Sequence, residues 1–306
     1  MHTHKMYAKA LALLCGLLAC GALHAQTLKT IAEIQTPVSA DNDTSALHGQ
    51  SVKVQGVVMT PPGKWYQVTQ QGGSSSFWIQ AKGQTGPKTG LQIRLQDYTL
   101  AQALGVANLQ PGTEVEITGK VDYFSGETQI AFDKETPVKV LNLNVPITEP
   151  DVFTPVGTFN DANKAAQPTG EEWQGSLVKI QNVEVIFVNS ATNPPRGNYR
   201  VKDAQGNIID IWDPNIDMRN SENGFAKPSV GQVFTLVKGI VYHRKFETPY
   251  YELHPWRPDW AKSDTNTVPP SIQRVSRTPV CPKADEAVKI TANVVHNAGT
   301  PIAAVR

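Results

Sequence analysis

The chain has 306 residues, with 28 Lys and Arg against 27 Asp and Glu, so its net charge at neutral pH is +1. This balance argues against strong non-specific attraction to nucleic acid or anionic lipid, because both depend on a surplus of positive charge. The length allows about two domains that each bury a core. Glycine and proline are frequent, with 23 and 22 residues, and long helical periodicities are absent, which favours an all-β protein.

The first 25 residues have the features of a secretory signal peptide. Lys5 and Lys9 precede an apolar run over residues 10–23, which is shorter than the roughly 20 residues of a transmembrane helix. Cleavage after Ala25 would give a soluble exported protein. The alternative is cleavage before Cys20, because "LLAC" resembles the lipobox of bacterial lipoproteins, and a lipid on Cys20 would then anchor the chain to the outer membrane. We therefore predict export, to the periplasm or out of the cell, with no transmembrane segment after signal removal.

The first predicted domain covers residues 28–143 and has five strands. The stretch "SVKVQGVV" alternates apolar and polar residues with a period of two, which is typical of a strand with one more solvent-exposed face. The sequence predicts the other strands over residues 65–70, 77–81, 114–121 and 126–132. A short helix, capped by Asp97 and stopped by Gly105, separates the third strand from the fourth. This order of elements is that of an OB-fold barrel.

The second predicted domain, residues 150–262, repeats this order. The stretch "LVKIQNVEV" corresponds to the first strand, and Asn182 stands where the first copy has Gly56, so we expect a milder bend there. The remaining strands of this copy are predicted within "NYRVKDAQGN", "NIIDIWD", "VGQVFTLVKGIVYH" and "PYYELHP". A repeat of about 120 residues is far longer than a solenoid unit and indicates a duplicated domain.

Residues 263–306 combine a polar linker with one or two alternating strands. A sandwich domain needs about seven strands, so this segment is predicted to be an incomplete β tail. The predicted fold class is therefore all-β, with two tandem five-stranded OB-fold-like barrels and an incomplete tail. We expect the chain to be a monomer.

Two segments of the first copy, "IAEIQTPVSADNDTSALHGQSVKVQGVVMT" and "EITGKVDYFSGETQI", resemble OB-fold modules that precede the catalytic domain of secreted bacterial nucleases of the endonuclease/exonuclease/phosphatase type. The second copy, with "YRVKDAQGN" and "YYELHP", is similar to OB-like modules of the same exported proteins. The tail resembles the opening of an Ig-like or fibronectin-type domain. The resemblance implies a binding accessory module. It implies no catalytic residue, because the nuclease domain has no counterpart in this sequence, and we predict a protein that is not an enzyme.

The candidate ligand-binding residues follow from the OB fold, which binds ligands across its second and third strands and the adjoining loops. In the first copy, Trp65 and Trp78 flank a Gly/Ser-rich loop and are candidates for stacking on a base or sugar ring; the alternative is that they fill the barrel core. In the second copy, Arg244, Lys245 and Tyr251 combine positive charge with an aromatic ring. This combination suits single-stranded nucleic acid, and the alternative is a solvated hairpin with core tyrosines.

No cofactor and no metal site is predicted. Asp210, Asp213 and Asp217 offer oxygen ligands, but their spacing fits no EF-hand loop. Cys281 is the single cysteine beyond the signal, which excludes an intrachain disulfide and a cysteine zinc site. The predicted function is an exported, non-catalytic module that binds nucleic acid. A spacer module that binds no polymer and a hydrolase with an unrecognised site stay open as alternatives.

Overall fold

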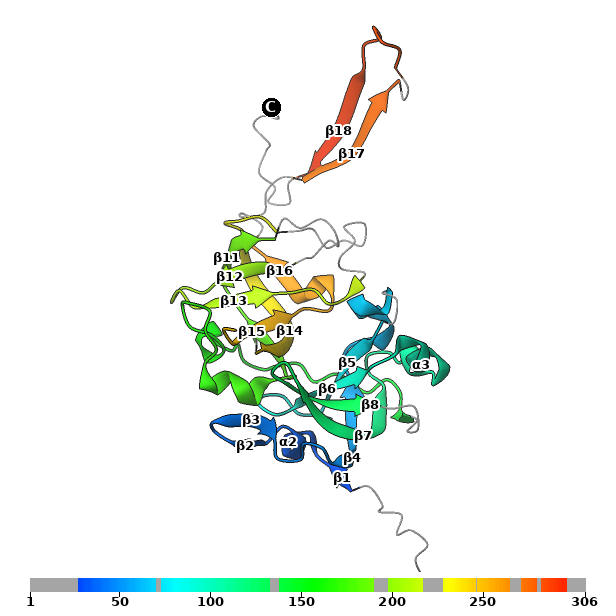
Figure 1. Ribbon diagram of the computed structural model, residues 1–306. Coiled ribbons are helices and arrows are strands. Elements are labelled where there is room, and N and C mark those ends of the chain that lie inside the picture. Colours follow the sequence, from blue (N-terminus) through cyan, green and yellow to red (C-terminus); the bar gives the residue numbers. More distant parts are fainter. Residues whose placement is uncertain are drawn as a thin grey trace, which may run out of the picture.

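The computed structural model describes residues 27–69, 73–132, 138–189, 198–216, 228–245, 247–264, 271–279 and 282–295. The predicted signal peptide, Cys20 and Cys281 lie outside these ranges. Within them, no helix is long and apolar enough to cross a membrane. Figure 1 shows two neighbouring bodies built mainly from strands, and a C-terminal hairpin.

The first body is a closed barrel of five strands: β4 (Ser51–Val58), β5 (Ser75–Gln80), β6 (Gly90–Leu95), β7 (Glu114–Phe124) and β8 (Glu127–Phe132). The barrel closes because β4 pairs antiparallel with both β5 and β7, and β8 runs parallel to β6 and antiparallel to β7. The short strands β1 (Leu28–Lys29) and β9 (Lys139–Asn142) extend it at β4 and β7. Helix α3 (Tyr98–Ala103) begins at the predicted cap, Asp97, whose side chain accepts from the Thr99 N–H.

One predicted strand of this barrel is wrong, and one strand of the barrel was not predicted. The described part of residues 65–70 contains no strand: η1 (Pro62–Lys64) and η2 (Tyr66–Thr69) are short 3-10 helices around Trp65. They fold this way because the segment packs on the second barrel, where the Tyr66 N–H donates to the Pro214 carbonyl. The second and third barrel strands are instead β5 and β6, and β6 was not predicted.

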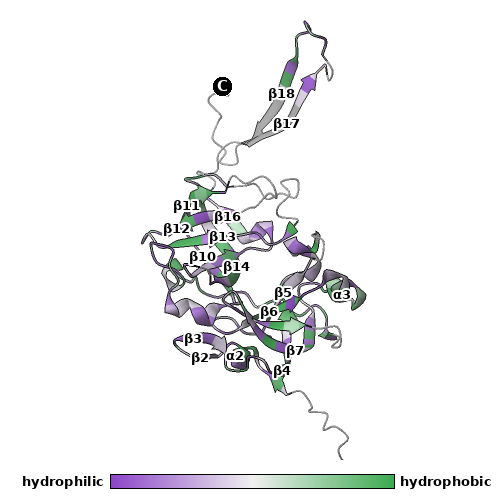
Figure 2. Ribbon diagram, in the orientation of Figure 1, coloured by the Kyte–Doolittle hydropathy of each residue, from purple (hydrophilic) through white to green (hydrophobic). Residues whose placement is uncertain are grey.

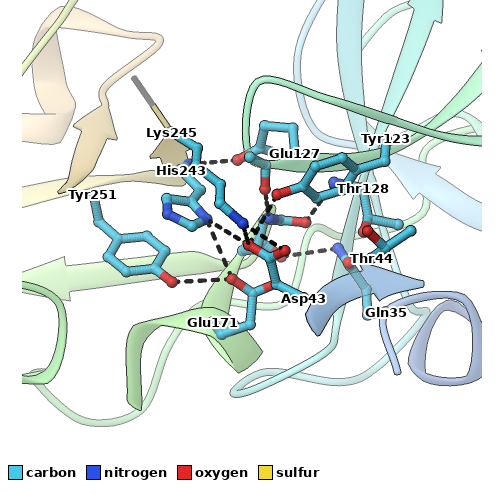
Figure 3. A network of polar contacts seen from close by, with 12 residues as sticks. Gln35, Asp43, Thr44, Tyr123, Glu127, Thr128, Glu171, His243, Lys245 and Tyr251 are labelled. Atoms are coloured by element: carbon cyan, nitrogen blue, oxygen red, sulfur yellow. Dashed lines mark hydrogen bonds and ion pairs between the residues drawn. The ribbon is translucent and has the colours of Figure 1, made fainter. Parts of the chain in front are cut away.

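The chain enters the first barrel through elements that the sequence analysis did not predict. Helix α2 (Ile31–Ile34) is fixed by a capping box, in which Thr30 and Glu33 exchange side-chain-to-backbone hydrogen bonds. A two-stranded hairpin follows, formed by β2 (Pro37–Ser39) and β3 (Asn42–Ser45). This hairpin places Asp43 beside the second barrel (Figure 3).

The second body is also a closed barrel, formed by β10 (Leu177–Ile180), β11 (Val183–Val188), β12 (Tyr199–Lys202), β13 (Ile208–Ile211), β14 (Val233–Arg244) and β15 (Tyr250–His254). Its strands occupy the predicted stretches, and β10 and β11 together make the first barrel strand, because both pair with β14. The milder bend expected at Asn182 is wrong. Asn182 has a left-handed φ of 50° and divides the strand in two, whereas β4 runs through Gly56 without a break.

The remaining described elements connect or extend the two barrels. They are η3 (Val106–Asn108), η4 (Val156–Thr158), η5 (Pro168–Trp173), η8 (Pro258–Trp260) and β16 (Ala261–Ser263), followed by β17 (Ser271–Thr278) and β18 (Lys289–Val295). The last two pair into a two-stranded sheet, in line with the one or two strands expected in the tail. The boundaries assigned to the domains stay predictions.

Apolar residues gather in three clusters, and Figure 2 shows hydrophobic residues along the strands of both barrels. One cluster fills each barrel, with Phe77 in the first and Tyr199 in the second. The third, here called the junction cluster, lies between the barrels and consists of Met59, Trp65, Trp78, Leu177, Trp212, Ile240, Tyr242, Trp256 and Trp260. The fold is therefore all-β, with two tandem OB-fold-like barrels that share an aromatic junction.

Candidate functional site

The face of the first barrel that an OB fold would use for ligands is largely covered by the second barrel. On β5 and β6, Trp78 pairs with Gln92 and Ser76 pairs with Arg94, and these side chains point away from the Phe77 side of the sheet. Trp78 packs on Trp256 of the second barrel, with ring centroids 5.7 Å apart. Only part of this face is left for a ligand.

Polar contacts fix the two barrels against each other. A side chain at Gly90 would meet the Gly175 carbonyl oxygen, because an added Cβ would lie 1.8 Å from it. The Gln174 side chain accepts from the Thr128 N–H at 2.7 Å and donates to the Gly126 carbonyl. The barrels therefore meet backbone to backbone, which leaves no room for a polymer between Gly90 and Gly175.

This packing corrects the role predicted for Trp78. Its side chain has no exposed surface, so it cannot stack on a base. Neither does it fill the barrel core, which was the alternative, because it belongs to the junction cluster. Trp65 is in the same cluster, 4% exposed, and stacks on Trp256 rather than presenting a free face. Both tryptophans hold the barrels together.

An opening remains at one edge of the junction. It is a cavity of about 210 Å³, here called the Arg–aromatic pocket, lined by Trp65, Tyr66, Gln67, Arg94, Phe124, Ser125, Trp212, Tyr242 and Arg244. Both barrels contribute to it. The pocket brings two guanidinium groups together with five aromatic rings, a combination that binds anions and flat rings.

Arg244 is held in this pocket by a buried carboxylate and by aromatic rings. Its Nε donates to Glu252 Oε1 at 2.8 Å, and its guanidinium carbon lies 5.1 Å from the Tyr242 ring and 5.4 Å from the Trp212 ring. Burial alone would raise the pKa of Glu252, but the hydrogen bond from His254 and the charge of Arg244 outweigh it and lower that pKa. Much of the charge of Arg244 is therefore already balanced.

Arg94 differs from Arg244 because it has no carboxylate partner among the residues that the structure describes. Its Nη1 donates to Ser76 Oγ at 3.2 Å and to Gln67 Oε1 at 3.4 Å. Burial lowers the pKa of Arg94 below its ordinary value, and an arginine in this range still carries its charge at neutral pH. A half-buried cation with only neutral partners attracts an anion. Sequence reasoning missed Arg94 because β6 was not predicted.

The predicted grouping of Arg244, Lys245 and Tyr251 in one site is wrong. Because side chains alternate along β14, Tyr242 and Arg244 face the pocket, while His243 and Lys245 face the β2–β3 hairpin. Lys245 Nζ lies 2.9 Å from Asp43 Oδ1. The Tyr251 ring is 2% exposed and stacks on His243, with centroids 4.4 Å apart. Neither Lys245 nor Tyr251 lines the pocket.

The other side of β14 forms part of a polar cluster that joins the barrels (Figure 3). It consists of Asp43, Tyr123, Glu127, Glu171, His243, Lys245 and Tyr251, from segments far apart in sequence. Tyr123 donates to Asp43, and Tyr251 donates to Glu171. Burial, with a contribution from the Asp43 carboxylate, raises the pKa of Tyr123, so its hydroxyl stays a donor.

Glu127 is the most buried carboxyl group of the polar cluster. It is fully buried, and its Oε1 accepts from the His243 N–H at 2.5 Å. Burial raises the pKa of Glu127 well above its ordinary value. Burial thus favours the uncharged form of Glu127, while Asp43 pairs with Lys245 and Glu171 lies beside His243.

Among the described residues, the group that could hold a metal lies in this cluster and not at Asp210. Asp43, Glu171 and His243 place one ligand atom each within 4.8 Å of one another. Asp210, which the sequence suggested, binds Lys164 and Arg200 at 2.7 Å each and is occupied by these cations. Asp217 lies outside the described residues.

No protein-family model matches this chain, and no curated protein matches it significantly. Among solved structures, it is similar to the p202 HIN1 domain in complex with 12-mer double-stranded DNA, with 13% identity over 74% of this chain and 100% of that one, at a TM-score of 0.32. It is also similar to a replication protein A heterotrimer bound to single-stranded DNA, with 14% identity over 67% of this chain and 49% of that one, at a TM-score of 0.30. A third similar structure is the wild-type single-stranded DNA binding protein of Thermus aquaticus, with 12% identity over 69% of this chain and 92% of that one, at a TM-score of 0.21.

Proposed function

We propose that this chain is a nucleic-acid-binding module, and that a single-stranded segment binds at the Arg–aromatic pocket. The observation that carries the proposal is Arg94. Its half-buried guanidinium has no carboxylate partner in the described part of the chain, and it opens into a pocket lined with aromatic rings. A phosphate group would supply the missing charge, and a base would cover the rings.

The pocket has room for a single base or sugar ring and its phosphate. Phe124, at the end of β7, is 60% exposed and offers its ring for stacking. Tyr66 is partly exposed and lines the pocket, with its ring packed on Trp65 and Trp212. Stacking of one base on an aromatic side chain contributes about 1–3 kcal/mol. Since the chain carries a net charge of only +1, we expect weak binding that depends on these few contacts.

The test is a fluorescence anisotropy titration of the full chain with a labelled single-stranded oligonucleotide of about 10 nucleotides, at low and rising salt. Arg94→Gln should weaken binding and reduce the slope of log affinity against log salt by about one. Phe124→Ala should weaken binding by about tenfold, because a stacked base is lost. Arg257→Gln is the matched control, because Arg257 is an exposed arginine outside the pocket that pairs with Asp259.

The Arg257→Gln control distinguishes binding at the pocket from general charge attraction. Binding that Arg94→Gln and Arg257→Gln reduce equally would show that charge in general, and not the pocket, holds the oligonucleotide. No binding at low salt would contradict the proposal. It would favour the second candidate, a spacer module, for which the buried junction cluster is the supporting observation: nine large apolar residues fix the distance between the barrels.

We further propose that this module is part of an exported protein that also carries a nuclease domain. The sequence resemblance to OB-fold modules of secreted bacterial nucleases supports an exported protein in which this chain binds and another domain cleaves. The reading frame that follows the codon for Arg306 tests this setting. A nuclease domain encoded in that frame is the expected finding, and an unrelated frame would contradict it.

A further inference from the structure

The polar cluster of Figure 3 suggests a second site, independent of the proposed nucleic-acid binding. We propose that Asp43, Glu171 and His243 bind one divalent transition-metal ion, with Zn²⁺ as the best match. The ion would tie three separate parts of the chain together: the β2–β3 hairpin, η5 and β14.

The distances between the ligand atoms suit such an ion. His243 Nδ1 lies 3.2 Å from Glu171 Oε2 and 4.0 Å from Asp43 Oδ2. Two atoms that each bind Zn²⁺ at roughly 2.1 Å in tetrahedral geometry lie about 3.4 Å apart. Small side-chain adjustments are therefore enough to bring the three ligands into place.

The His243 ring is the observation that points to a ligand. Its side chain is 5% exposed, and neither ring nitrogen has a hydrogen-bond partner in the part of the chain that the structure describes. Its Nδ1 is nevertheless directed at two carboxylates, and the ring is held in position by the Tyr251 ring. A buried imidazole without hydrogen bonds is unfavourable in water-free surroundings, and a metal at Nδ1 would satisfy that nitrogen.

Two tyrosines hold the carboxylates in the orientation that a metal needs. The Tyr123 hydroxyl donates to Asp43 Oδ2 at 2.9 Å, and the Tyr251 hydroxyl donates to Glu171 Oε2 at 3.0 Å. Partners of this kind orient metal ligands and raise affinity. One nitrogen and two carboxylate oxygens suit Zn²⁺ and its neighbours, whereas Ca²⁺ prefers six to eight oxygen ligands.

Lys245 competes with a metal for Asp43. Its Nζ lies 2.9 and 3.0 Å from the two Asp43 carboxylate oxygens, and its side chain is 45% exposed. It can therefore swing into solvent when an ion arrives. This contact gives the site a distinctive test, because removal of the lysine charge should strengthen metal binding while removal of a carboxylate should weaken it.

The experiment is a calorimetric titration of the full chain with ZnCl₂, with CoCl₂ absorption as a second readout of the ligand geometry. Asp43→Asn and Glu171→Gln, both partly exposed and so tolerated by the fold, should each weaken Zn²⁺ binding by about tenfold or more. Lys245→Met should tighten binding by several-fold. Glu184→Gln, which removes a carboxylate from an exposed ion pair with Lys202, is the matched control and should leave binding unchanged.

Either of two results would overturn the proposed metal site. The site is contradicted if the wild-type chain binds neither Zn²⁺ nor Co²⁺. It is also contradicted if the Asp43→Asn and Glu171→Gln variants bind Zn²⁺ as tightly as the Glu184→Gln control. Circular dichroism of each variant establishes that it is folded before its affinity is compared.

Discussion

Trp65 of the first barrel and Trp256 of the second stack across the junction, with ring centroids 6.0 Å apart and planes inclined by 22°. Trp78 packs against both of them, at 5.6 and 5.7 Å. The three rings are almost completely buried. Because neither barrel alone would cover them, the barrels stabilise each other.

Replacement of Trp78 tests this coupling. Trp78→Ala removes a fully buried ring and should lower the free energy of unfolding by about 3–5 kcal/mol in a urea titration. Because the lost contacts join the barrels, we also expect a single unfolding transition to separate into two. Phe124→Ala removes an exposed ring and should change stability by less than about 0.5 kcal/mol. Equal stability of the two variants would contradict the junction.

Gly90→Ala tests the close approach of the backbones. A Cβ at this position would lie 1.8 Å from the Gly175 carbonyl oxygen, so the barrels must move apart to accept it. We expect faster amide hydrogen exchange along the junction, for example at Thr89 and Tyr66. Gly49→Ala is the control. It has a φ of +82° but no atom within 4 Å of the added Cβ, so its strain should stay local and cost about 1–2 kcal/mol.

The buried and exposed ion pairs should differ sharply in their contribution to stability. Arg244→Ala leaves the buried Glu252 carboxylate without its cation and should cost about 3 kcal/mol. Arg257→Ala breaks a pair whose side chains are 65% and 58% exposed, and should cost less than about 1 kcal/mol. Thermal or urea unfolding of both variants measures the difference. Glu252→Gln added to Arg244→Ala should recover part of the loss, because no unpaired charge is then buried.

The capping box at α2 should make the start of the first barrel sensitive to acid. Hydrogen bonds from the Thr30 backbone and from Lys29 lower the pKa of Glu33 to about 2. A carboxyl group with a lowered pKa stabilises the fold above its ordinary pKa of 4.5, and that contribution is lost as the pH falls from there towards 2. An NMR titration of the Glu33 carboxyl checks the value. In Glu33→Gln, α2 should lose this dependence on pH; an ordinary pKa in the wild type would contradict the capping box.

Period-two alternation predicted much of the two barrels. It located β4, the internal repeat then located the strands of the second copy, and the cap at Asp97 located α3. It failed at Trp65, because residues 62–69 form short 3-10 helices that pack on the second barrel. It also left out β6, although Leu91, Ile93 and Leu95 alternate there.

The junction and the polar cluster could not be derived from local patterns, because both depend on contacts between barrels. One signal was available: "SSFWIQ" in β5 places the aromatic rings of Phe77 and Trp78 on opposite faces, and the strand is buried along its whole length, which is typical of a strand covered on both sides. Nothing local connects Asp43, Glu171 and His243, since they lie on a hairpin, a 3-10 helix and a strand. Their proximity follows only from how the barrels dock.

The alternation at the end of β14 has a consequence for how this protein tolerates change. A substitution at Arg244 affects the side of the strand that lines the Arg–aromatic pocket, and a substitution at His243 affects the side in the polar cluster. Each leaves the opposite side intact. An insertion or deletion of one residue between Gly239 and Tyr242 would exchange the two sides, turning Arg244 towards the carboxylates and Lys245 towards the rings. Both surfaces would then fail together, so the length of this strand should vary less than its individual residues.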